Sequence, residues 1–306
     1  MHANNILKLN KGVFKMLIAV LSALGLLTLY FAIIFIKDYM LASKEGRLEK
    51  PSFVATGAVG FATNFFDTLG IGSFAPTTAL LKQFKLTNDR TIPGTLNVSC
   101  TIPVVLEAFI FITVIKVDPI TLVTMLAAAT VGAILGAGYV AKLDVKKIEL
   151  AMGVALLVVA FIMIAQQLKM FPAGGDAIGL TGGKLIFAII ANFILGALMT
   201  LGIGLYAPCM ALVFSLGLSP AIAFPIMMGS CAFLMPAASV KFVKEGAYDR
   251  KASMAITVFG VIAVLIAAYI VKSLPLDILK WLVIVVIIYT SAMMFKSYSK
   301  PVKQKV

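Results

Sequence analysis

Two stretches of this chain combine glycine, hydroxyl-bearing and proline residues in a spacing that could bind a small anion. Residues 68–80 begin with Thr-Leu-Gly-Ile-Gly and place a proline four residues after the second glycine. Residues 200–212 repeat the pattern 132 positions later, with nine of thirteen residues identical. Glycine and proline in this arrangement cannot continue a regular helix. A helix that restarts after such a break presents unpaired N–H groups and the positive end of its dipole, which suit an anion. We therefore interpret the two stretches as a duplicated binding element.

Candidate substrate-binding residues come from both breaks and from polar residues in the span that follows each break. Glycine lets a ligand approach the backbone closely, and hydroxyl groups add hydrogen-bond donors. The candidates are Thr68, Gly70, Gly72, Ser73 and Pro76 in the first break, Thr200, Gly202, Gly204, Tyr206 and Pro208 in the second, and Asn97, Ser99 and Ser230 in the spans that follow. The alternative is that the small residues only allow close helix packing and that the polar side chains bond between helices.

Ionisable and amide residues inside apolar segments are candidates for coupling transport to a proton or a cation. Asp67 and Asn64 lie three residues apart before the first break, on one helix face, and Glu107 lies deep in a later apolar segment. A carboxylate in a membrane span is costly and marks a functional site by default. The second copy of the motif has Met199 where the first has Asp67, so this feature is not duplicated. A structural, protonated carboxyl is the alternative. Lys241 is expected to extend to the membrane surface.

The cysteines raise a different class of function. Cys100 and Cys231 occupy matching positions of the two copies, each preceded by a serine. Two such thiols could relay electrons across a membrane by thiol–disulfide exchange. Free cysteine in an apolar helix is more often a small packing residue, and the chain has no Cys-x-x-Cys motif to receive electrons.

The composition indicates a membrane protein. Hydrophobic residues make up 61% of the 306 residues and charged residues 13%, against about 25% charged residues in soluble domains. A chain of this length has room for about nine or ten spans of about 20 residues. The net charge is +13, and the Lys and Arg residues that produce it cluster in loops and tails. They are not gathered with the stacking aromatic residues that a nucleic-acid groove requires. The one histidine is His2, and nucleotide-binding and hydrolase motifs are absent. We expect no enzyme activity, no cofactor, no metal site and no nucleic-acid partner.

Apolar segments follow the same order in both halves. They cover residues 14–36, then 52–69, 73–81, 92–115, 120–141 and 148–168, and again 185–201, 205–216, 220–240, 253–271 and 276–295. The predicted organisation is an N-terminal anchoring helix and linker (1–50), a first repeat (51–171), a Gly-rich linker (172–184), a second repeat (185–296) and a basic tail (297–306). Each repeat contains a broken or re-entrant segment pair and three full spans.

Charge then predicts the topology. With the C-terminal tail in the cytoplasm, loops 37–50, 82–90, 142–147 and 241–251 and the chain from Lys296 onward carry 18 of the 26 Lys and Arg residues, as the positive-inside rule expects. Matching loops of the two halves then fall on opposite faces, so the repeats are inverted. The orientation of helix 14–36 stays open, because the basic residues before it are placed outside.

These motifs resemble the sulfite exporter TauE/SafE family of permeases. The residues that carry the resemblance are Gly57-Ala58-Val59-Gly60-Phe61 before the first break and Gly196-Ala197 before the second, followed in each half by Gly-Ile-Gly and proline. The resemblance covers about residues 52–296. It implies a secondary carrier that exports small sulfur-containing or organic anions such as sulfite or sulfonates. Family members often have three consecutive glycines where this chain has Gly-Ile-Gly.

The sequence therefore predicts an all-α integral membrane protein in the cell membrane, with a cytoplasmic C-terminus. An anion would bind near the membrane midplane between two broken helices, and alternating access would move it. An anion channel and the dithiol relay are the alternatives. The partners expected are a small anion and the lipid bilayer, and assembly into a homo-oligomer stays open.

Overall fold

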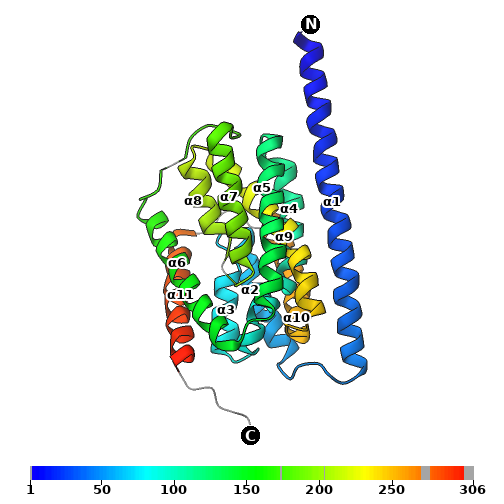
Figure 1. The fold of residues 1–306 in the computed structure, drawn as a ribbon, viewed down its shortest axis with the longest axis vertical. Coiled ribbons are helices and arrows are strands. Elements are labelled where there is room, and N and C mark those ends of the chain that lie inside the picture. The colour runs from blue at the N-terminus through cyan, green and yellow to red at the C-terminus, as the bar shows by residue number, and fades with distance from the viewer. Residues whose placement is uncertain (1, 173, 203, 270–275, 300–306) are drawn as a thin grey trace.

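The described part of the chain is a bundle of helices. The computed structural model describes residues 2–172, 174–202, 204–269 and 276–299 (Figure 1). Within these ranges seven helices are long and apolar enough to span a membrane, fewer than the nine or ten spans for which the length allows room. Three other helices near the two breaks have only 16, 10 and 10 residues. The composition and these lengths together support a multi-pass membrane protein.

The helices follow the predicted order closely. They are α1 (His2–Lys44), α2 (Phe53–Thr68), α3 (Phe74–Gln83), the short 3₁₀ helix η1 (Asp89–Thr91), α4 (Ile92–Val114), α5 (Pro119–Val140), α6 (Val145–Gln167), α7 (Gly182–Met199), α8 (Tyr206–Ser215), α9 (Pro220–Lys244), α10 (Arg250–Tyr269) and α11 (Leu276–Ser299). Proline stands at the start of α4, α5 and α9, where its missing N–H costs nothing.

Helix α1 is longer than the apolar run at residues 14–36 predicts. It extends to Lys44, and Gly46 with a positive φ of 67° follows its end. Polar contacts tie this end to the bundle: Arg250 Nε lies 2.8 Å from Asp38 Oδ2, and the Tyr248 hydroxyl donates to the same oxygen at 2.5 Å. These contacts fix the C-terminal end of α1 to the residues at the start of α10.

The helices α2 to α6 of the first half correspond in order to α7 to α11 of the second, and their packing partners correspond too. Helix α2 packs on α10 as α7 packs on α5. Helix α4 packs on its counterpart α9, and α6 packs on its counterpart α11. Glycines permit the close crossings. A Cβ at Gly60 of α2 would lie 2.5 Å from the Cα of Ile256 of α10, and one at Gly196 of α7 would meet the carbonyl oxygen of Ala129 of α5. In Figure 1, α2 and α3 lie in the lower part of the bundle and α7 and α8 in the upper part.

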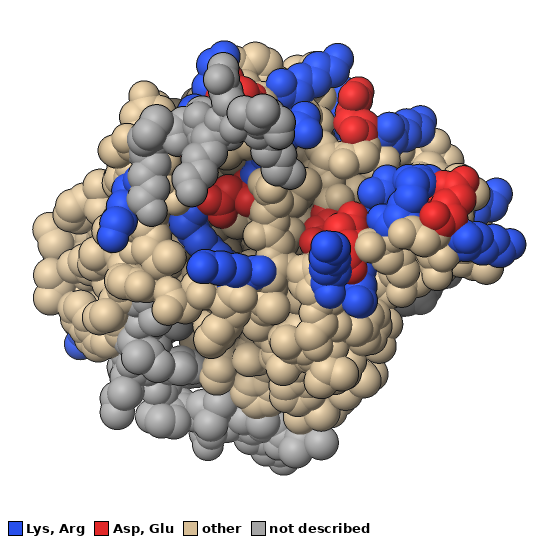
Figure 2. Space-filling view, turned by 90° about the horizontal axis from the view of Figure 1, so that it is seen from below, with Lys and Arg blue, Asp and Glu red and all other residues tan. Residues whose placement is uncertain are grey.

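One end of the bundle gathers the basic loops. Lys82 Nζ pairs with Asp89 and donates to Ser297 Oγ at 3.1 Å, and Thr87 Oγ1 donates to Asp249 Oδ2 at 3.1 Å. These contacts bring the α3–α4 loop, the α9–α10 loop and the end of α11 together. Figure 2 shows Lys and Arg, with Asp and Glu among them, over this end. We call it the basic face. Residues 300–306 of the predicted tail lie outside the described residues.

Candidate functional site

The first break ends α2 and begins α3 within five residues. The N–H of Gly70 donates to the carbonyl oxygen of Asp67 at 2.8 Å, and Gly70 has a φ of +86°. Gly72 also has a positive φ, of +91°. An L side chain adopts this backbone region at a cost, which explains glycine at both positions. Helix α3 then starts at Phe74 after Ser73, whose side chain does not cap the helix.

The second break begins as the first does, although Gly204, unlike Gly72, has no positive φ. Helix α7 ends at Met199, the N–H of Gly202 donates to the Met199 carbonyl oxygen at 2.9 Å, and Gly202 has a φ of +90°. Helix α8 starts at Tyr206. Ile203, in the middle of this motif, lies outside the described residues.

The two breaks face each other across a small cavity. A Cβ built on Gly72 would lie 3.9 Å from the Cβ of Tyr206, and one built on Gly204 would lie 3.9 Å from the Cβ of Phe74. The cavity between them measures about 10 Å³, which is enough for one water molecule. Its lining is Asp67, Gly72, Ser73, Phe74, Val104, Met199, Gly204, Leu205, Tyr206 and Cys231. We call this the central cavity, and the N-termini of α3 and α8 both border it.

Glu107 connects the two breaks. The hydroxyl of Thr68, at the end of α2, donates to Glu107 Oε1 at 2.8 Å, and the hydroxyl of Tyr206, at the start of α8, donates to Glu107 Oε2 at 2.9 Å. Glu107 and Thr68 are at most 3% exposed, and Tyr206 is 4% exposed. A carboxyl group of α4 therefore holds residues from both halves in one hydrogen-bonded unit.

Asp67 lies on the wall of the central cavity. It interacts with the backbone and the hydroxyl of Ser73, while its Oδ2 atom is buried and has no hydrogen-bond partner in the structure. No Lys, Arg or His is among the described residues that line the cavity. Two carboxyl groups thus meet two helix N-termini without a basic side chain. The described residues also contain no group of three His, Cys, Asp or Glu side chains that could hold a metal ion.

The thiols gather around the same place. Cys231 lines the central cavity and lies 3.6 Å from the Met199 sulfur, and Ser73 Oγ lies 3.8 Å from Cys100 Sγ. Cys209 of α8 is buried as well, and all three cysteines are free thiols. Sequence spacing alone does not reveal this convergence, because the cysteines lie on three different helices.

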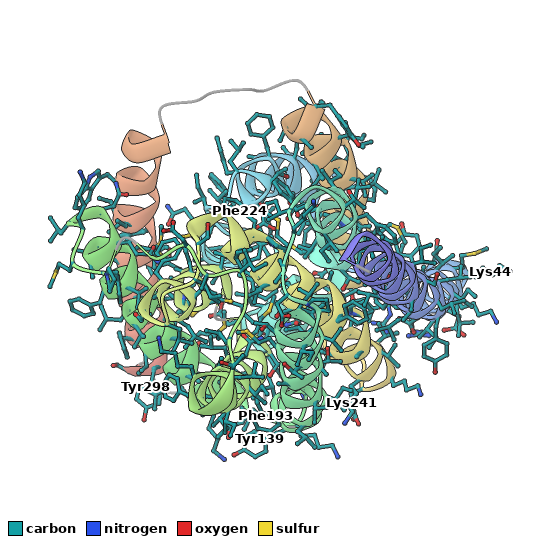
Figure 3. All side chains as sticks on the ribbon, turned by 90° about the horizontal axis from the view of Figure 1, so that it is seen from above. Lys44, Tyr139, Phe193, Phe224, Lys241 and Tyr298 are labelled. Carbon is teal, nitrogen blue, oxygen red and sulfur yellow. The ribbon has the colours of Figure 1, made fainter. Side chains whose placement is uncertain are left out.

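Several predicted residues face away from the central cavity. Asn64 donates to Gly60 and lies against Gly260 of α10, Asn97 donates to Pro93, and Ser99 lies beside Cys100 with its backbone carbonyl bonded to Thr257. Thr200 donates to Ala197, and Ser230 accepts from Asn192. Gly70, Gly202, Pro76 and Pro208 belong to the breaks or half-helices but not to the cavity wall. Lys241 lies against Gly138 near the edge of the bundle (Figure 3).

A second, larger cavity adjoins the first break from the side of the α6–α7 linker. It measures about 170 Å³ and is lined by Gly70, Ile71, Met163, Gln166, Gln167, Ala207, Met210 and Phe214. We call it the linker-side cavity. Gln166 Nε2 donates to the carbonyl oxygen of Ala207 at 3.1 Å. This hydrogen bond brings the Gln166 amide to the start of α8.

At the corresponding place in the other half, α3 packs against α11. Exchange of the halves relates α6 to α11, α8 to α3 and Gly70 to Gly202. There Lys82 of α3 donates to Ser297 of α11, and a Cβ at Gly202 would lie 2.9 Å from the Met152 methyl group. The two halves are alike in helix pairing but differ in the contacts around their breaks.

Comparison with known families agrees with the resemblance noted from the motifs. The model of the sulfite exporter TauE/SafE family matches residues 185–305, which include the second break and α7 to α11. Neither the curated proteins nor the solved structures contain a match to this chain. The match and the seven apolar helices support a membrane transporter of the kind that carries sulfite and related anions, and they fit a protein that is not an enzyme.

Proposed function

We propose that this protein is a secondary transporter of small sulfur-containing or organic anions, such as sulfite or sulfonates, and that it binds them between the two breaks. The observation that carries the proposal is the meeting of two half-helix N-termini, one from each half, at one cavity. Backbone N–H groups and helix dipoles there favour a negative charge without any Lys or Arg. Broken helices in matching positions are typical of a transporter's central site.

The fold proposed for this function is an N-terminal helix followed by two inverted repeats, residues 51–171 and 185–296. The exchange symmetry of the helix pairs supports it, and so does the position of α2 and α3 at the opposite end of the bundle from α7 and α8 (Figure 1). The short α3 and α8 are then the second arms of re-entrant or half-crossing segments. The basic face is proposed to be cytoplasmic, in keeping with the positive-inside rule.

Alternating access is proposed as the transport mechanism, and the unequal cavities support it. The linker-side cavity of about 170 Å³ reaches the first break, while at the basic face Lys82 of α3 donates to Ser297 of α11. The central cavity holds about one water, so an oxyanion must part the two breaks to enter. In the proposed orientation this conformation is open toward the outside. Export is the direction that the family name implies, and this conformation would be the one that releases the anion outside.

Ligand binding tests the substrate class directly. A thermal-shift screen of the purified protein against sulfite, sulfate, thiosulfate, taurine and sulfoacetate should raise the melting temperature for at least one anion, because a ligand that binds only the folded state stabilises it. Gly72→Val, which fills the cavity wall, should abolish that shift, whereas Val131→Ala on the exposed face of α5 should keep it. Absence of a shift and of saturable counterflow in proteoliposomes for all five compounds would overturn the proposal.

Two alternatives make different predictions. A channel requires a continuous hydrated path and gives no counterflow; a central cavity of about 10 Å³ favours the carrier. A dithiol relay requires Cys100 and Cys231, which are both buried free thiols. Retained anion transport in a Cys100→Ser/Cys231→Ser protein would dismiss the relay, and lost transport would revive it.

A further inference from the structure

Two buried acids lie at the central cavity: Asp67 on its wall, and Glu107 bonded to Tyr206 of that wall. Asp67 and Glu107 are at most 1% exposed and interact electrostatically with each other. The other titratable groups that face this pair are two thiols and a phenol, contributed by α4, α8 and α9: Cys100, Tyr206 and Cys231. None of these side chains is a base that carries positive charge, and the lining described above contains no Lys, Arg or His.

The negative charge of the two carboxylates opposes the entry of an anion into the central cavity. A buried charge without a counter-charge is costly, and two adjacent carboxylates repel each other. A guest anion would add a third negative charge to the same water-poor space. The half-helix dipoles compensate only part of this charge, because each N-terminus carries about half a positive charge. Protons on the carboxyl groups would neutralise the site without a further ligand.

The unpartnered oxygen of Asp67 points to the same conclusion. Oδ2 of Asp67 is buried on the cavity wall and accepts no hydrogen bond. A protonated Asp67 would offer its O–H at this position to an acceptor in the cavity, and an oxyanion is a strong acceptor. Glu107 differs, since both of its oxygens already receive hydroxyl donors, so it can keep a negative charge when the cavity is empty.

We propose that the Asp67–Glu107 pair takes up at least one proton with each anion, so that the protein is a proton–anion co-transporter. This inference rests on the proposed function. The proton binds to a carboxylate oxygen from the side on which the anion enters, remains there as an O–H during the transition, and leaves to water with the anion on the other side. A divalent anion with one proton still moves one negative charge, so an inside-negative potential would continue to favour export.

The test measures proton and anion movement together in proteoliposomes that contain the full chain. Sulfate, thiosulfate and sulfoacetate are the probes, because they do not exchange protons near neutral pH. With the membrane potential clamped at zero, a pH gradient of one unit should accumulate a transported probe by about tenfold per coupled proton. An internal pH dye should report proton entry in proportion to tracer entry.

Variants and controls separate the possible results. In Asp67→Asn/Glu107→Gln, a pH gradient should no longer accumulate the anion, and proton entry should no longer accompany tracer entry. Protein-free liposomes give the baseline for sulfite, which itself binds protons. Asp118→Asn keeps an N-cap of α5 far from the site and should behave as the wild type. Tracer entry in the wild type without proton entry would overturn this inference and leave the proposed function standing. Failure of every probe and of sulfite to enter would overturn the proposed function itself.

Discussion

Replacement of Tyr206 by phenylalanine is the sharpest test of the link between the two halves. The variant keeps the ring that lines the central cavity and removes only the hydroxyl that donates to Glu107 Oε2 at 2.9 Å. Both groups are buried, so water cannot replace the lost donor without rearrangement. Leaving a buried acceptor without its donor costs about 1–3 kcal/mol. We expect Tyr206→Phe to lower the free energy of unfolding by that amount.

The assay is an equilibrium unfolding titration with SDS in mixed micelles, with Tyr269→Phe as the matched control. Tyr269 of α10 is 69% exposed, so its hydroxyl loss should stay within about 0.5 kcal/mol of the wild type. In a double-mutant cycle, Tyr206→Phe and Glu107→Gln should be non-additive by about 0.5–3 kcal/mol. If Tyr206→Phe unfolds at the same SDS fraction as Tyr269→Phe, Glu107 does not connect the breaks in the way described.

Three further predictions concern the breaks, the linker-side cavity and the basic face. Gly202→Ala should destabilise the protein more than Gly72→Ala in the same titration: both strain a positive φ, by about 1–2 kcal/mol, but only the Gly202 methyl group would press on Met152. In Met210→Cys, a thiol reagent should label the new cysteine and slow transport, whereas the wild-type thiols, all buried, should react little; equal labelling of both proteins would count against an accessible cavity. Burial raises the pKa of Asp249 to about 6 from 3.8, so its contribution to stability is greatest below pH 3.8 and is lost as the pH rises to 6. The wild-type melting temperature, relative to Asp249→Asn, should therefore fall across that range, and a constant difference would contradict the assignment.

The helix boundaries and the two breaks follow from local sequence. Gly-Ile-Gly followed by proline stops a helix wherever it stands, and the apolar segments have the lengths that spans require. The predicted segments accordingly agree with the helices within a few residues, apart from α1, whose polar ends continue the helix. The family resemblance also rests on short motifs, and the family match over the second half confirms it.

What each side chain faces depended on packing. These helices are apolar on nearly every side, so sequence periodicity does not show which face turns inward. Asn64 and Ser230 have the chemistry of a binding residue, yet they turn to α10 and α7, while Glu107 meets Tyr206 across 99 positions of the chain. Residue types and spacing thus determined where the chain is interrupted. Only the docking of one half on the other decided that both interruptions border one cavity and that Glu107 bonds to both, because helix rotation and contact across the halves are properties of the assembled bundle.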